Sequence, residues 1–155
     1  MNKATLWLIA FVLVGQAYVF AADFSAVIEE RQELMKANRA AQKTLKSAAG
    51  SGDLATVEAE ANKLAKQFDK IADPALFPEG STSDKSRART LVWEERAAFV
   101  KKATDSAAIA RSIAAEAKAG KLQEVRASVN SLGKRTCTNC HTEFRKPRAI
   151  KGSTP

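Results

Sequence analysis

The two cysteines and the single histidine of this 155-residue chain lie together, as Cys137, Cys140 and His141. Residues three and four apart share one face of a helix, so on a helix the three side chains point the same way. The C-x-x-C-H pattern is typical of covalent haem attachment. Two sulfurs can bond the porphyrin vinyl groups, and the histidine can reach the iron. We predict one haem c, held by Cys137 and Cys140, with His141 as an iron ligand.

Three other kinds of site use cysteine pairs, and each fits this sequence less well. A structural disulfide suits an oxidising compartment but needs no adjacent histidine. A thioredoxin-type redox pair is expected beside an alternating strand and helix pattern, which this sequence lacks. A zinc site needs four ligands, and the chain offers no second pair of cysteines or histidines.

The second axial ligand of the iron is restricted by composition. With one histidine, bis-histidine ligation within the chain is excluded, and Met35 is the only methionine besides Met1. If a methionine binds the iron, it is therefore Met35. Antiparallel first and last helices would bring Met35 and His141 within about 9 Å along the bundle, at 1.5 Å per residue. Ordinary core packing explains the position of Met35 equally well.

Two polar residues interrupt the apolar stripe that contains Met35. Arg31 lies one turn before it and Asn38 lies three residues after it. No acidic residue stands three or four positions from Arg31. A haem propionate would supply a partner through a charge-assisted hydrogen bond, so Arg31 is a candidate cofactor-binding residue. The alternative is a position at the solvated edge of the stripe.

The elements that position these residues begin after an N-terminal leader. Residues 1–21 combine a positive start at Lys3 with a long apolar run and small residues before the expected cleavage after Ala21. This is the layout of a secretory signal peptide, and an uncleaved anchor is the alternative. We therefore predict periplasmic export, a mature domain over 22–155, and no stable membrane insertion after cleavage.

Helical periodicity covers the rest of the chain, and no segment alternates as a strand would. The pattern predicts helices over 24–49, 53–72, 87–119 (or from 91) and 121–146. Gly50 to Gly52, Pro74 and Gly120 separate them. Four helices with short connections and one longer loop predict an all-α antiparallel up-down-up-down bundle enclosing one haem. The alanine-rich third helix allows close backbone approach or leaves room for something bulky, and we expect the second.

The chain is basic, with a formal net charge of +8 that becomes +7 without the leader. Nucleic acid is a poor explanation, since no aromatic residues are interleaved with the basic ones. We instead expect an acidic redox partner protein, recognised by the five basic residues that flank the haem motif. These are Lys134, Arg135, Arg145, Lys146 and Arg148. A merely solubilising charge is the alternative, and a homodimer is an open option.

The mature chain resembles the cytochrome c′ family. The resemblance rests mainly on the segments 31–36 (RQELMK) and 137–145 (CTNCHTEFR), with Trp93 and Phe99 as weaker support. It implies a four-helix bundle with haem c between the helices, a proximal ligand at His141 and an arginine near the propionates at Arg31.

The family divides over the position of Met35. In cytochromes c′ proper, this residue caps an open site that binds gases such as NO or CO. In the cytochrome c-556 type, it is the sixth ligand of a low-spin electron carrier. The residues 35–38 look more like the second type. We therefore expect a one-electron carrier with His141 and Met35 as axial ligands and no substrate turnover, and keep gas binding as the alternative.

Overall fold

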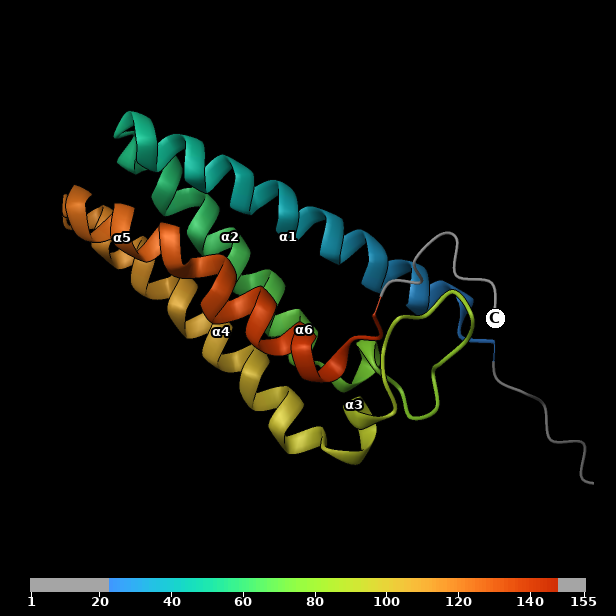
Figure 1. Cartoon of the computed structure of the whole chain (residues 1–155). Helices are drawn as coiled ribbons and strands as arrows, with labels where there is room; N and C mark the ends of the chain where they lie inside the picture. The colour runs from blue at the N-terminus through green and yellow to red at the C-terminus, as the bar shows by residue number, and fades with distance from the viewer. Residues whose placement is uncertain (1–22, 148–155) are drawn as a thin grey trace, which may run out of the picture.

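Residues 23–147, as described by a computed structural model, form an antiparallel four-helix bundle, which confirms the predicted fold class (Figure 1). The long helices are α1 (Ser25–Ser51), α2 (Leu54–Ala72) and α4 (Arg96–Lys118). The fourth consists of α5 (Leu122–Gly133), η2 (Lys134–Thr138) and α6 (Asn139–Phe144). The predicted leader 1–21 lies outside the described residues. Within 23–147, none of the helices has the length and apolar character needed to span a bilayer.

The turn between α1 and α2 forms where the sequence predicts it. Gly52 adopts a left-handed conformation with φ 81°, which glycine tolerates because it has no Cβ. The side chain of Asp53 then accepts a hydrogen bond from the Thr56 backbone N–H at 3.0 Å and caps α2. A similar turn at Gly120 (φ 74°) joins α4 to α5 at the same end of the bundle.

At the other end, a longer connection contains η1 (Pro74–Leu76) and the short helix α3 (Leu91–Glu94). The prediction of one continuous third helix is wrong here, because the backbone breaks at Glu95 (φ −111°, ψ 45°) before α4 begins. The Trp93 indole N–H donates to the carbonyl oxygens of Phe77 and Pro78, at 3.2 and 2.8 Å. This tertiary contact holds α3 against the loop instead of in line with α4.

The core lies between α2 and α4, which pack more extensively than the other helix pairs. Small side chains on α4 allow this approach, which is one of the two explanations that the alanine pattern left open. The buried alanines are Ala103, Ala107, Ala110, Ala114 and Ala117. Val57, Leu64 and Phe68 of α2 fill the facing positions. The bundle is therefore tight between α2 and α4, and it opens on the side of α1 and α6, where the predicted site residues lie.

Candidate haem site

A cavity of about 1090 Å³ is bounded by α1, α4, the 85–88 segment and the η2–α6 segment. All five predicted site residues line it: Arg31, Met35, Cys137, Cys140 and His141. Small-molecule and cofactor sites typically measure about 300–1,000 Å³, so the space suits a large planar cofactor. The fold thus joins two segments that are far apart in the sequence, one on the first long helix and one near the end of the described chain.

The motif segment departs from the regular α-helix assumed in the prediction. Lys134–Thr138 is a π-helical turn, in which the Asn139 backbone N–H donates to the Lys134 carbonyl. Inside this turn, the Thr136 hydroxyl donates a hydrogen bond to the Leu132 carbonyl at 2.8 Å. The hydroxyl therefore competes with the backbone N–H groups of the helix for that carbonyl. Cys137 lies in this wider turn, whereas Cys140 and His141 lie in α6. Both cysteines still line the cavity.

The donor groups have the chemistry that haem c requires. Both thiols are free. Burial raises the pKa of Cys140 to about 11, so its sulfur is a protonated thiol at neutral pH. Burial, with smaller contributions from Arg145 and Arg87, lowers the pKa of His141 to about 4. Its imidazole is therefore neutral at pH 7, which is the form that binds a metal.

Aromatic and aliphatic side chains make up much of the cavity wall. The rings of Phe77 and Phe99 meet edge to face at 4.9 Å, and those of Phe99 and Phe144 at 5.2 Å. All three rings line the cavity, together with Phe68, Ile71 and Val92. An apolar wall beside free thiols and a neutral imidazole fits a porphyrin. These residues therefore fit haem c, with Cys137 and Cys140 to hold it and His141 to ligate its iron.

Arg31 is tied to the protein itself. It is only 6% exposed, so the alternative of a solvated edge position is wrong. Its Nε donates to the Leu76 carbonyl at 2.5 Å, and its two Nη atoms donate to the carbonyl and hydroxyl of Ser81. The guanidinium also lies 4.2 Å from the centre of the Phe77 ring. Three of its five N–H groups thus fix the 76–81 loop, and its contribution to propionate binding stays a prediction.

Replacing Arg31 should therefore affect folding as well as any cofactor contact. We expect Arg31→Met to lower the free energy of unfolding by about 3 kcal/mol, because it leaves buried acceptors of the loop unpaired. Arg39→Met is the matched control, since Arg39 is exposed on the same helix and makes no polar contact with the described residues. Urea unfolding of both variants tests this, and equal midpoints would contradict it.

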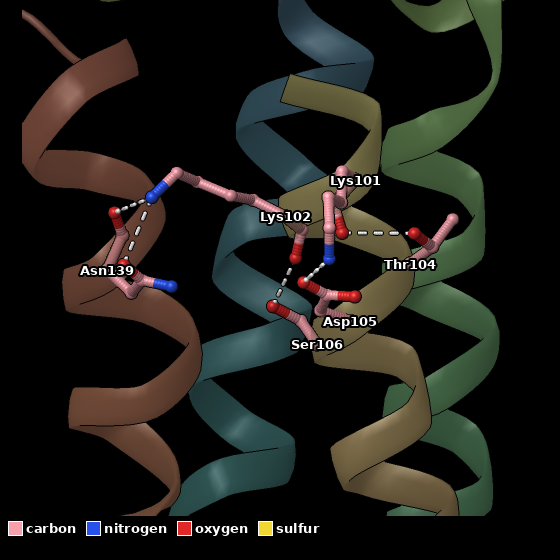
Figure 2. Close-up of polar contacts among 6 residues, drawn as sticks. All are labelled: Lys101, Lys102, Thr104, Asp105, Ser106 and Asn139. Carbon is pink, nitrogen blue, oxygen red and sulfur yellow. Dashed lines mark hydrogen bonds and ion pairs between the residues drawn. The ribbon is translucent and has the colours of Figure 1, made fainter. Parts of the chain in front are cut away.

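Lys102 is a residue of the site that the sequence prediction missed. It lines the cavity from α4, and its Nζ donates to the Asn139 side-chain oxygen at 3.1 Å and to the Asn139 carbonyl at 3.4 Å (Figure 2). It also pairs with Glu143 at 3.0 Å. Because Asn139 lies between the two cysteines, this lysine fastens the attachment segment to α4.

Charge around the cavity has one sign. Eight of the lining residues are lysines or arginines, and none is acidic: Arg31, Lys36, Arg39, Lys43, Lys85, Arg87, Lys102 and Arg145. Only Arg145 belongs to the five basic residues predicted as the docking group, and Arg148 lies outside the described residues. The basic patch is therefore formed largely by α1 and the 85–87 segment, which the linear sequence does not place beside the haem motif.

Both the sequence and the fold of this chain have similar counterparts among known proteins. The sequence profile of the family described as Cytochrome C' matches residues 26–145. The chain is 36% identical to cytochrome c' of Pararhodospirillum photometricum over 128 residues, which cover 81% of this chain and all of the relative. The fold of this chain matches that of cytochrome c' from Rhodobacter Spheriodes, with a TM-score of 0.68 and 26% identity. The match covers 82% of this chain and 100% of that structure.

A third similar structure is a nitrosyl complex of a single-residue variant of cytochrome c prime from Alcaligenes xylosoxidans. Its TM-score is 0.68 and its sequence identity is 24%. The match covers 81% of this chain and 98% of that structure. These relatives are cytochromes c′, and they give no support to the expected low-spin c-556 type. Proteins of this kind carry a covalently attached c-type haem, as the motif predicts. On the family match and the 36% identity, the chain belongs to the cytochrome c′ family.

Proposed function

We propose that this protein is a five-coordinate cytochrome c′ that binds NO or CO, with His141 as the iron ligand and Met35 as a wall of the ligand pocket. One finding carries the proposal: the family model and the similar proteins are cytochromes c′. In this chain, His141 and Met35 line one large cavity, which both kinds of ligation would require. When bound, the haem would supply Fe(III)/Fe(II) chemistry and a coordination position for a small ligand.

The chain's own residues provide binding, orientation and exclusion of water. Cys137 and Cys140 would hold the cofactor, while Lys102 fastens the segment that carries them. The phenylalanine rings and Met35 make part of the cavity wall apolar, and an apolar wall suits a small uncharged ligand. The nitrosyl complex of the Alcaligenes xylosoxidans protein supports the proposal, since that bundle has the same fold.

The visible spectrum of the purified, reduced protein tests this function. We expect high-spin bands that change when CO or NO is added, because no protein group fills the sixth position. Low-spin bands that ignore both gases would contradict the proposal and favour the electron carrier with His141 and Met35 ligation. That alternative keeps one structural argument, namely that Met35 faces the same cavity as His141.

We also propose export to the periplasm and docking of an acidic redox partner on the basic cavity patch. Arg39 and Lys43 are exposed there and make no ion pair with the described residues, so their charges are free to meet a partner. A homodimer stays an open prediction.

The docking proposal predicts a strong dependence on ionic strength. Electron exchange with a negatively charged redox protein should slow by about tenfold or more between 0.01 and 0.1 M salt, as the Debye length falls from about 30 to 10 Å. The double variant Arg39→Gln, Lys43→Gln should flatten this dependence, measured by stopped-flow. Lys118→Gln, at the end of α4 beside the turn to α5, is the control and should keep it. A rate that ignores salt would mean that the charges only solubilise the protein.

A further inference from the structure

The segment that carries the haem motif has little helical stability of its own. It consists of the π-helical turn Lys134–Thr138 and of α6, which has six residues (Asn139–Phe144). Among the described residues, no side chain caps the start of either part. Isolated helices shorter than about 12 residues are marginal in water. The position of His141 within α6 therefore depends on contacts that other elements make with this segment.

Lys102 of α4 makes such contacts (Figure 2). Its Nζ donates to the side-chain oxygen and the backbone carbonyl of Asn139, at 3.1 and 3.4 Å, and pairs with the Glu143 carboxylate at 3.0 Å. These three contacts match the three N–H donors of an ammonium group. The lysine side chain is only 20% exposed, so salt and solvent screen its charge less than that of a surface lysine. Lys102 is thus a strong and specific fastening for α6.

This fastening and His141 lie on different faces of α6. Asn139 and Glu143 are four residues apart, so their side chains are neighbours on the helix. His141 is two residues from each of them, which places it about 200° around the helix, on the opposite face. His141 lines the cavity, whereas Asn139 and Glu143 do not. Lys102 therefore holds the face of α6 that is turned away from the cavity, and His141 is directed into it.

The end of α6 is held independently of Lys102. The backbone N–H of Arg89 donates to the Phe144 carbonyl at 3.0 Å, and the Arg89 Nη1 donates to the Glu143 carbonyl at 2.9 Å. Loss of the Lys102 contacts should leave this anchor in place. The segment would then stay attached at its end while its first turn, which contains His141, gains freedom to move.

We propose that Lys102 is a positioning residue for His141. By fastening Asn139 and Glu143 to α4, it sets the direction and reach of the imidazole and so the strength of the bond between His141 and the haem iron. Groups that hold a metal ligand in place commonly tune the metal in this way. The inference rests on the proposed five-coordinate function, in which His141 is the sole protein ligand and its displacement is not shared with a second one.

Lys102→Met tests the positioning role, because methionine keeps much of the side-chain length and removes the charge and all three donors. In the reduced holoprotein, we expect the Fe–His stretching band in the resonance Raman spectrum to broaden and to shift to lower frequency. Amide hydrogen exchange over residues 139–143 should become about tenfold faster, the equivalent of one hydrogen bond. The Raman band reports on the iron bond itself, which a purely structural role elsewhere in the bundle would not move.

Two further variants separate position from charge. Lys101→Met removes the neighbouring lysine of α4, whose Nζ pairs with Asp105 on the same helix at 2.8 Å (Figure 2), and should leave both measurements unchanged. Asn139→Ala removes an acceptor of the Lys102 contact without altering any charge. It should shift the Raman band in the same direction as Lys102→Met by a smaller amount, and it tests the contact independently of how well Lys102→Met takes up haem.

Equal results for Lys102→Met and Lys101→Met would overturn the positioning role and leave gas binding by the unmodified protein intact. A shifted band in Lys102→Met alone, with normal hydrogen exchange and no effect of Asn139→Ala, would also overturn it, because only the charge would then act on the haem. A low-spin spectrum of the unmodified reduced protein would overturn the proposed function and the positioning role together.

Discussion

Changing both Cys137 and Cys140 to alanine is expected to convert a covalently held haem into an extractable one. The unmodified protein, made in a host with haem-c maturation, should keep its haem through acid–acetone extraction. The double variant has no thiol left in the chain, so no thioether can form. The absorbance of the organic phase after extraction measures this directly. We expect no haem in the organic phase for the unmodified protein and essentially all of the haem there for the double variant.

The control for this experiment lies in the same segment. Thr138 is exposed, lines the cavity and lies between the two cysteines, so Thr138→Ala should leave attachment unchanged. Each single cysteine variant should keep one covalent bond and resist extraction. Haem that stays with the double variant after extraction would refute covalent attachment through this motif.

Met35→Ala is expected to leave the high-spin spectrum unchanged and to speed the binding of CO by the reduced protein. In the proposed five-coordinate protein, Met35 lines the cavity and does not bind the iron, so its removal enlarges the cavity without taking a ligand from the iron. Removing most of a half-buried side chain should also lower the free energy of unfolding by about 2 kcal/mol, the lower end for such truncations. Visible spectra, CO flash photolysis and urea unfolding measure the three effects.

The control is Met35→Leu, which keeps most of the side-chain volume and removes the sulfur. If Met35 acts only as a wall, Met35→Leu should resemble the unmodified protein in spectrum and CO rate. The opposite outcome would be a low-spin unmodified protein that becomes high-spin in both variants, with a lower midpoint potential. That result would restore Met35 as the soft sulfur ligand of an electron carrier.

The sequence by itself determined the fold class and most helix boundaries, because these depend on local chemistry. Gly52 supplies the left-handed turn and Asp53 the cap of α2, so the first hairpin was predictable from neighbouring residues. Cys137, Cys140 and His141 could be recognised as a haem site for the same reason: the motif is complete within a few positions. Composition alone also restricted a thioether ligand to Met35.

Only the tertiary structure decided how the site is closed and which buried polar atoms have no partner among the described residues. The π turn at 134–138 and the break at Glu95 are irregularities that average helix periodicity does not contain. Arg31 gave no sign in the sequence of its bonds to the 76–81 loop, and Lys102 gave none of its bonds to Asn139. The buried, unpaired state of Asn38 has the same origin. Hydrogen bonds between distant segments depend on how helices pack, and packing brings together residues that no local pattern relates.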